Sequence, residues 1–309
     1  MNLQDRYLGC LLGLACGDAV GTTVEFSPRG SFAPLTGMVG GGPFSLQAGQ
    51  WTDDTSMALC LAASLVECND FDARDQMERY VRWLEEGYYS STGRCFDIGA
   101  TTSQALHRYQ RTGDPFSGSA DPYAAGNGSI MRLAPVPLFF HPDRTAAMHY
   151  AAQSSRTTHA AAECLDACRL LAAILHAALA GKEKEQALFA QAGRIPEDAP
   201  LSPKIQDIAD GAYRHKPIDE IDGSGYVVKS LEAALWCFYT TTSYRDAILA
   251  AANLGNDADT TAAICGQVAG AYYGIQAIPT EWLERVALRD EIERLALALY
   301  AAHAAAASA

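Results

Sequence analysis

The sequence predicts an all-α protein, a single compact multi-helix bundle whose long loops gather at one end. Three observations favour this fold class. Apolar residues recur at helical spacing, as with Leu3, Tyr7 and Cys10, and much of the chain is alanine-rich. No segment alternates apolar and polar residues in the manner of a half-buried strand. No internal repeat or break in composition marks a linker, so residues 1–300 are expected to form one domain, followed by a frayed alanine-rich tail at 301–309.

The individual helices follow from apolar spacing and from residues that begin or end a helix. The first is expected to end where Gly17-Asp18 interrupts an apolar run, and the second to begin after Thr52. Segments 27–50 and 112–128 are rich in glycine and proline and are expected to be loops. Helices are expected at residues 3–16, 53–69, 72–86, a segment ending near 113, 143–153, 160–180, 182–192, 202–214, 227–239, 244–253, 258–273 and 281–300.

Composition argues against several classes of partner. The net charge is −13 and the pI near 4.9, whereas a nucleic-acid binder needs a basic face. The same acidity argues against an anionic membrane surface. The nine cysteines form no C-x-x-C pair and lie mostly in apolar runs, which is typical of small core residues in a reducing cytoplasm. A cytoplasmic monomer that binds no nucleic acid is therefore expected.

The N-terminal segment is strongly apolar. Leu8–Val20 resembles the apolar part of a signal peptide, but Asp5 offsets Arg6 and Asp18 interrupts the run. The segment is expected to be a core helix, and no stretch is expected to span a membrane.

Two acidic clusters each open an alanine-rich helix. One contains Asp53 and Asp54, the other Asp257 and Asp259, and each includes threonines but no histidine or cysteine. Oxygen ligands without soft donors favour a hard cation, Mg²⁺ or Mn²⁺, over zinc. The alternative is that these residues act only as helix N-caps. If the two helix starts converge, four carboxylates would repel one another unless a cation neutralised them, which favours a binuclear metal site.

Other polar residues lie in loops, and each has two interpretations. Glu25 sits between apolar neighbours and is either an exposed loop glutamate or a functional carboxylate. Asp97 lies in a glycine-containing turn and is either an N-cap or a functional carboxylate. The segment Gly126–Arg132 precedes an expected helix, and its glycines suit a phosphate cradle or a plain turn.

Two further residues stand at the beginning of expected helices. His159 is more often a cap or a surface group in such a position than a functional one. Tyr226 follows a glycine-rich stretch and is either a core tyrosine or a stacking platform.

Taken together and in order, these motifs resemble the ADP-ribosylglycohydrolase family, from residue 6 to about 290. Two of these motifs are most similar to those of the dinitrogenase reductase-activating glycohydrolase branch, whose members remove ADP-ribose from arginine. These two are Phe96-Asp97-Ile98-Gly99 and Gly225-Tyr226-Val227. The other motifs are Gly17-Asp18-Ala19-Val20-Gly21 with Glu25-Phe26, Thr52-Asp53-Asp54-Thr55, Gly126-Asn127-Gly128-Ser129 with Met131-Arg132, Thr158-His159, and Gly255-Asn256-Asp257-Ala258-Asp259-Thr260-Thr261.

The resemblance implies an all-α fold with two Mg²⁺ or Mn²⁺ ions in a central cleft. It further implies hydrolysis of the bond between ADP-ribose and a protein arginine, with Glu25 beside the metals and Asp97 facing the guanidinium. Ala100 stands where related enzymes often carry asparagine, so one amide contact that bears on substrate preference is missing. The implied metal ligands are Thr52, Asp53, Asp54, Asp257, Asp259 and Thr260, and the implied substrate-binding residues are Gly99, Thr101, Gly126, Asn127, Gly128, Ser129, Ile130, Met131, Arg132, His159 and Tyr226.

Three other functions remain open on the sequence. The first is hydrolysis of another ADP-ribosyl linkage, serine-linked or O-acetyl-ADP-ribose. The second is a metal-dependent phosphohydrolase, since two-metal sites often serve phosphate esters. The third is a protein that binds ADP-ribose without hydrolysing it.

Overall fold

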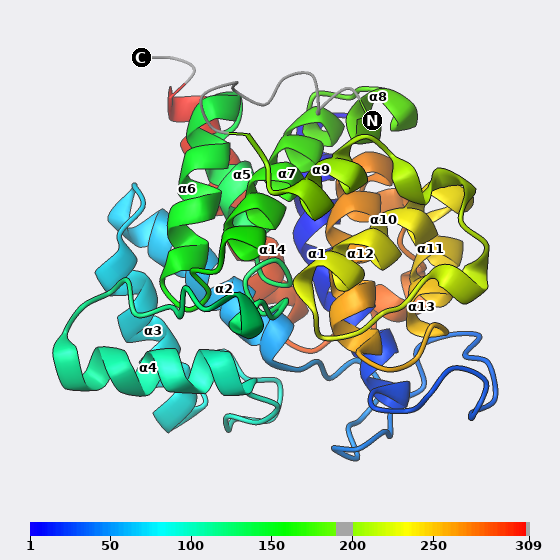
Figure 1. Ribbon diagram of the computed structural model, residues 1–309, viewed down its shortest axis with the longest axis horizontal. Coiled ribbons are helices and arrows are strands. Elements are labelled where there is room, and N and C mark those ends of the chain that lie inside the picture. The colour runs from blue at the N-terminus through cyan, green and yellow to red at the C-terminus, as the bar shows by residue number, and fades with distance from the viewer. Residues whose placement is uncertain (190–199, 307–309) are drawn as a thin grey trace.

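The computed structural model describes residues 1–189 and 200–306, and Figure 1 shows their helical arrangement. Within these residues β-structure is limited to isolated bridges, which confirms the predicted all-α class. The α-helices are α1 (Leu3–Gly21), α2 (Asp53–Cys68), α3 (Ala73–Glu86), α4 (Ala100–Thr112), α5 (Pro135–Phe140), α6 (Arg144–Arg156), α7 (Ala162–Leu179), α8 (Lys184–Phe189), α9 (Pro203–Ala209), α10 (Val227–Thr240), α11 (Tyr244–Ala252), α12 (Ala258–Tyr273), α13 (Thr280–Leu283) and α14 (Arg289–Ala306).

Helices α1 and α12 lie side by side at the centre of the molecule (Figure 1). Glycines at every fourth position of α1 make the close approach possible, because residues four apart share one face of a helix. A Cβ atom added to Gly13 would lie 2.5 Å from the Gly266 carbonyl oxygen of α12, and one added to Gly17 would lie 2.2 Å from that of Ala262. Any side chain here would push the two backbones apart.

This antiparallel pairing brings the C-terminal end of α1 to the N-terminal end of α12. A Cβ on Gly21 would lie 2.4 Å from the Ala258 carbonyl oxygen, one residue from Asp257. Helix α1 continues to Gly21, beyond the expected end at residue 16, so Asp18 lies inside the helix rather than after it. The start of α2 packs against the same region, as the hydrogen bonds from Thr52 to Asp18 show.

A smaller apolar cluster joins α2, α3 and α4. Its buried members include Met57, Tyr80, Trp83 and Leu106. The cluster supports the loop between α3 and α4, which carries Asp97 toward the centre of the molecule.

Several expected elements differ from the structure. No helix begins directly after Arg132, since residues 129–132 form turns and α5 begins at Pro135. The expected helix 202–214 is divided into α9 and a 3₁₀ turn at Ala212–His215, and 281–300 is divided into α13 and α14. Helix α14 extends to Ala306, and part of the expected helix 182–192 lies outside the described residues.

The apolar N-terminal stretch packs into the core, as predicted. By length and composition Leu3–Val24 is apolar enough to cross a membrane, but 89% of its most apolar window is buried inside the structure. All nine cysteines are free thiols, and seven of them are fully buried, for example Cys10, Cys60 and Cys265.

Candidate metal centre and substrate cavity

The first acidic cluster forms the N-terminal turn of α2. Thr52 occupies the N-cap position, but its side chain caps no helical N–H group. Its hydroxyl oxygen lies 2.9 Å from Asp18 Oδ1, 3.3 Å from Asp54 Oδ2 and 3.3 Å from Asp259 Oδ2. One hydroxyl proton serves only one acceptor, and the shortest distance assigns it to Asp18. The capping interpretation therefore fails at Thr52. Toward Asp54 and Asp259 its hydroxyl oxygen presents only lone pairs, with no proton to donate.

Asp18 fixes the start of α2 and is the buried anchor of the site. It is fully buried and accepts from the backbone N–H and the hydroxyl of Thr52 (2.9 Å each) and from those of Thr55 (3.1 and 2.6 Å). Burial raises the pKa of Asp18 to about 6, and the hydrogen bonds from Thr55 and Thr52 hold it lower than burial alone would.

The second acidic cluster begins α12 and faces the first. Asp257 is the N-cap residue of α12 without a capping side-chain bond, and its Oδ2 accepts from Asn127 Nδ2 at 2.8 Å. The Thr260 hydroxyl lies 3.4 Å from Asp54 Oδ2. Residues about 200 positions apart in the chain thus converge on one point, as predicted, with Asp54 and Asp259 buried.

Glu25 and Asp97 join this group from two loops. With Asp259 they offer oxygens within 4.8 Å of one another. Glu25 is 5% exposed, which rules out the exposed-loop interpretation, and the N-cap of α4 is Gly99, so Asp97 caps nothing. Burial, then the charge of Asp97, raises the pKa of Glu25 to about 9. Burial, then the charge of Asp18, raises the pKa of Asp97 to about 7.

The donor set fits a hard divalent cation. Burial and neighbouring carboxylates also raise the pKa values of Asp53, Asp54 and Asp259 well above their usual range. Asp54 Oδ1 and Glu25 Oε2 are buried and have no hydrogen-bond partner among the described residues. Unpaired buried carboxylate oxygens are costly, and a bound cation satisfies them. All six predicted ligands present oxygen, the donor that Mg²⁺ and Mn²⁺ prefer.

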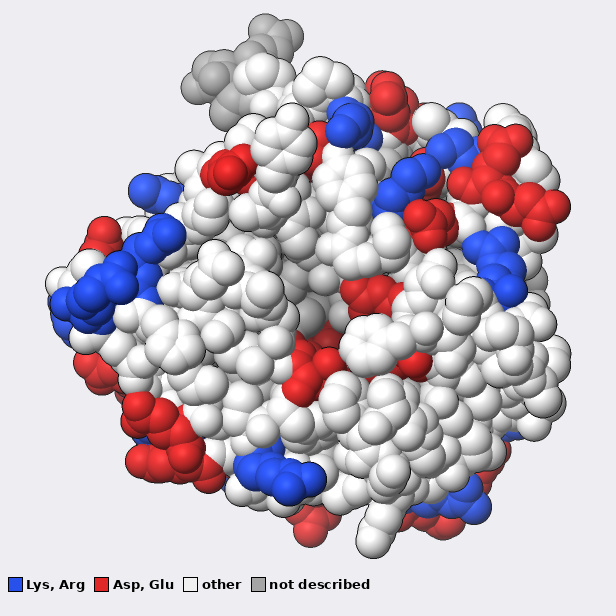
Figure 2. Space-filling model, turned by 60° about the horizontal axis from the view of Figure 1, so that its bottom comes forward, with Lys and Arg blue, Asp and Glu red and all other residues white. Residues whose placement is uncertain are grey.

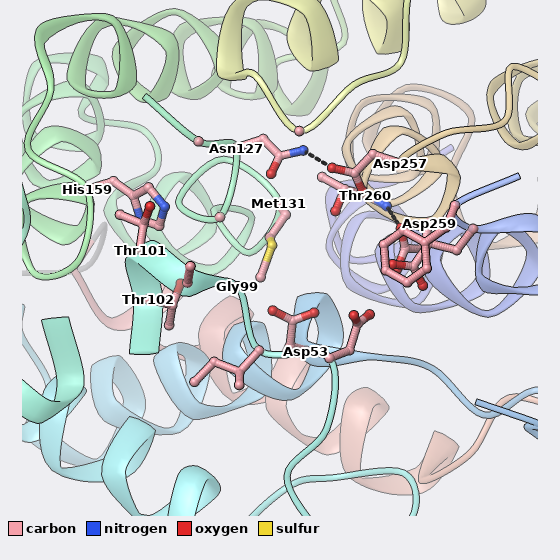
Figure 3. A pocket seen from close by; sticks show the side chains of 18 residues that line it. Asp53, Gly99, Thr101, Thr102, Asn127, Met131, His159, Asp257, Asp259 and Thr260 are labelled. Atoms are coloured by element: carbon pink, nitrogen blue, oxygen red, sulfur yellow. Dashed lines mark hydrogen bonds between the residues drawn. The ribbon is translucent and has the colours of Figure 1, made fainter. Parts of the chain in front are cut away.

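The acidic group forms one side of a cavity of about 370 Å³, a size typical of a small-molecule site. In Figure 3, Asp257, Asp259 and Thr260 lie on one side, Asp53 lies below, and His159 and Thr101 lie on the opposite side. The carboxylates gather in a central hollow of the face shown in Figure 2. One end of the cavity is therefore suited to cations and the other to neutral or anionic groups.

His159 closes the far side of the cavity and is 2% exposed, neither a surface group nor a cap. A Cβ added to Gly128 would lie 2.8 Å from the His159 Cε1 atom, and one added to Gly126 would lie 3.4 Å from Nε2. The two glycines therefore let the backbone approach the ring. Among the described residues, no group accepts a hydrogen bond from the N–H of Gly128 or Ser129. These two backbone N–H groups are therefore free hydrogen-bond donors, although they belong to a turn and not to a helix N-terminus.

The protonation of His159 is set from behind the cavity. Arg132 Nη2 donates to the Thr158 hydroxyl at 2.6 Å, so that hydroxyl has its own proton to give to His159 Nδ1, 2.8 Å away. Burial, then the charge of Arg132, lowers the pKa of His159 to about 3, so the ring is neutral. A neutral ring that accepts at Nδ1 carries its proton on Nε2, the atom beside Gly126.

Not every expected substrate residue reaches the cavity. Gly99, Thr101, Gly126, Asn127, Gly128, Met131 and His159 line it. The side chains of Ser129, Ile130 and Arg132 are buried behind it: Ser129 accepts from Ser155, Ile130 belongs to the main core, and Arg132 lies over the Tyr80 ring. Of the expected substrate-binding segment, the side chains of these three residues therefore do not face the cavity.

Tyr226 lines a second hollow of about 630 Å³, which shares Thr101, Gly126 and Gly225 with the first. Its hydroxyl donates to Glu163 at 2.5 Å and accepts from Lys204 at 2.7 Å. The ring is half-buried, packs against the core and lines the hollow, with Lys204 Nζ 5.1 Å from the ring centroid. The stacking-platform interpretation fits this position.

Asp18, Thr102 and Gly225 are site residues that the ligand assignment missed. Asp18 could have been found from the sequence, because it is a lone carboxylate within an apolar run. Aspartate is rarely buried unless its charge is paired or hydrogen-bonded. Thr102 and Gly225 line the cavity only because α4 and the loop before α10 meet there. Gly225 stands in a motif quoted above without a role of its own, and no local pattern marks Thr102.

An all-helical fold with an oxygen-rich acidic centre in a cavity defines a class of metal-binding helical proteins. Within that class the chain belongs to the ADP-ribosylglycohydrolase family, whose model matches residues 1–308. The chain is 49% identical to "ADP-ribosylarginine hydrolase Tri1" of Pseudomonas putida (strain GB-1), over 96% of this chain and 78% of that protein. It is 32% identical to "ADP-ribosyl-[dinitrogen reductase] glycohydrolase" of Rhodospirillum rubrum, over 94% of each. A solved structure, "ADP-ribosylglycohydrolase-related protein complex", superimposes with a TM-score of 0.85 at 46% identity, covering 97% of this chain and 99% of that one.

Proposed function

We propose that this protein hydrolyses the N-glycosidic bond between ADP-ribose and an arginine side chain of a modified protein, releasing ADP-ribose. One observation carries the proposal. Glu25, Asp97 and Asp259 place oxygens within 4.8 Å of one another at the acidic end of a cavity whose other end offers hydrogen-bond donors. A sugar bonded to a guanidinium needs the first end, and a diphosphate needs the second. Two relatives named as ADP-ribosylarginine hydrolases, at 49% and 44% identity, support this choice of linkage.

Thr52, Asp53, Asp54, Asp257, Asp259 and Thr260 would hold two Mg²⁺ or Mn²⁺ ions. Bound ions would supply positive charge that binds the ribose hydroxyl oxygens and lowers the pKa of a water molecule. Asp18 and Asn127 would orient this set from outside, Asp18 through Thr52 and Asn127 through Asp257.

Glu25 and Asp97 would handle the reacting groups. Cleavage builds positive charge on the ribose, which nearby carboxylates stabilise. Asp97 would pair with the guanidinium, a cation whose planar fork suits a carboxylate. Glu25 would act as the general acid and base, since a carboxyl with a raised pKa holds and returns a proton near neutral pH.

The rest of the ligand would extend away from the acidic group. The diphosphate would lie against the N–H groups of Gly128 and Ser129 and the Nε2–H of His159. The adenosine would reach the second hollow, where Tyr226 offers a ring face. An ADP-ribosylated protein as partner, a monomeric state and a cytoplasmic location remain predictions.

The test is a panel of linkages. Arginine-, serine- and O-acetyl-linked ADP-ribose are incubated with wild-type protein and Asp97→Ala, with and without EDTA, and the products are identified. We expect ADP-ribose from the arginine substrate only, lost with EDTA and strongly reduced in Asp97→Ala. Faster release from a serine or acetyl linkage would reassign the substrate. AMP or phosphate as product would indicate a phosphohydrolase, and tight ADP-ribose binding without turnover would indicate a binding protein.

A further inference from the structure

Three aromatic rings follow one another at the mouth of the cavity. Phe26 lines the cavity itself, its ring centroid lies 6.4 Å from that of Phe44, and Phe44 lies 5.2 Å from Phe96. The rings come from the loop after α1, the loop before α2 and the loop before α4. In Figure 2 uncharged surface surrounds the acidic hollow.

Two of these rings are direct neighbours of the carboxylates that face the reacting bond. Phe26 follows Glu25, and Phe96 precedes Asp97. Phe26 and Asp97 both adopt left-handed backbone angles, with φ of 60° each, which aspartate tolerates but which are unfavourable for a bulky residue such as Phe26. The Glu25 carboxylate is buried, whereas the ring of the next residue, Phe26, is 66% exposed. Strain and an exposed large ring at one position are a combination that concentrates at functional sites.

Phe44 and Phe96 also line a separate small hollow of about 260 Å³. Pro43, Leu46, Thr92 and Arg94 complete its lining. Pockets for whole small molecules begin at roughly 300 Å³, so this hollow suits a single apolar side chain better.

The hollow is preformed by the loop that carries Phe44. Gly41 and Leu46 exchange two backbone hydrogen bonds of 2.7 and 2.9 Å. A Cβ added to Gly42 would lie 2.4 Å from the Thr22 carbonyl oxygen, so the loop packs tightly against the end of α1. A partner would therefore meet a fixed surface rather than order a mobile one.

We propose that Phe44, Phe96 and the adjoining hollow, here called the aromatic rim, bind an apolar side chain of the substrate protein close to its modified arginine. The inference rests on the proposed function. With the diphosphate directed toward His159, the arginine must enter from the mouth beside Glu25 and Asp97. The polypeptide that carries this arginine then passes over the rings that adjoin those carboxylates. The rim would thus select among modified arginines by their neighbours.

The experiment compares three substrates. Two are peptides with ADP-ribosylated arginine that differ only in phenylalanine or serine on both sides of it, and the third is ADP-ribosyl-L-arginine without a peptide. We expect the wild-type protein to favour the phenylalanine peptide about tenfold in kcat/KM, mainly through KM. Phe44→Ser should abolish that preference, and Phe44→Leu should retain most of it. ADP-ribosyl-L-arginine should be hydrolysed at the same rate by all three proteins.

Phe116→Ser is the matched control, since Phe116 is also an exposed ring (37%) but packs under Arg156, away from the three rings. It should leave the preference unchanged. Equal kcat/KM for both peptides in the wild type would overturn the proposal that the aromatic rim binds an apolar side chain. An equal loss of kcat/KM on all three substrates in Phe44→Ser would overturn it as well. Failure of the wild type to hydrolyse even ADP-ribosyl-L-arginine would instead overturn the proposed function.

Discussion

At the scale of single residues, Glu25 and Asp97 occupy the same end of the cavity but reach it from different loops. Glu25 is buried, Asp97 is half-buried, and both lie among like charges, which raises their pKa values. Neither residue caps a helix or pairs with a cation among the described residues. A purely structural role would leave a buried and a half-buried carboxylate uncompensated, so a role toward the substrate is the better account.

Glu25→Gln and Asp97→Asn should each lower kcat on ADP-ribosyl-L-arginine by about 10²- to 10⁴-fold, because each removes a group that moves or orients a proton. Neither change should lower the melting temperature, since each replaces a carboxyl group that lies among other carboxylates by a neutral amide of the same shape. Initial rates and thermal unfolding measure both effects. Glu284→Gln, an exposed carboxylate elsewhere, is the control. An unchanged kcat would remove the assigned roles.

The relay from Arg132 through Thr158 to His159 gives a second prediction. Thr158→Val keeps the shape but removes the hydroxyl, so His159 should no longer be fixed with its proton on Nε2. Nitrogen NMR should show the Nε2–H form in the wild type and a mixture in the variant, with ADP-ribose bound about tenfold more weakly. Thr158→Ser keeps the hydroxyl and should behave as the wild type. A single Nε2–H form in Thr158→Val would show that Thr158 does not set the tautomer.

At the scale of elements, the site depends on how closely α1 approaches α12. The acidic clusters were readable in the sequence because carboxylates and threonines mark a helix start. Gly17 with Asp18 predicts the end of the first helix, and that expectation is wrong, because α1 continues to Gly21. Glycine is permissive both in turns and at close helix contacts, and local sequence does not tell which applies.

Gly17→Ala should lower the free energy of unfolding by about 3 kcal/mol or more, because its Cβ would meet backbone 2.2 Å away that has no room to yield. It should also weaken metal binding, since the displaced helix carries Asp18. Denaturant unfolding and calorimetry measure the two effects. Gly37→Ala, whose Cβ would meet nothing nearer than 3.8 Å, is the matched control. Equal stability of the two variants would contradict the close packing.

At the scale of the whole molecule, the fold gathers buried like charges that only a cation or protons can neutralise. Sequence reasoning predicted the helical class and the convergence of Asp53, Asp54, Asp257 and Asp259. It could not predict which side of the 126–132 turn faces the cavity, because that depends on where α7 and α2 pack against it. The burial of Arg132 beneath Tyr80 is a tertiary result of this kind.

Stability without metal should depend on pH. The folded pKa values of Asp18, Asp97 and Glu25, about 6, 7 and 9, all exceed their ordinary values. Groups with raised pKa values bind protons more tightly when folded, so stability is present at low pH and is lost as the pH rises through this range. The metal-free protein should therefore melt about 5 °C or more higher at pH 5.5 than at roughly pH 9, and Mg²⁺ should stabilise it more at the higher pH. Equal melting temperatures with EDTA at both values would contradict the charge cluster.

The most direct measurement is a calorimetric titration of metal-free protein with Mn²⁺. Because Asp54 joins the two acidic clusters from the start of α2, wild type should bind saturably and Asp54→Asn at least about tenfold more weakly. Asp290→Asn, an exposed acid on α14, should bind as the wild type does. The same affinity in Asp54→Asn and wild type, or no binding by either, would contradict a metal centre built from these two helix starts.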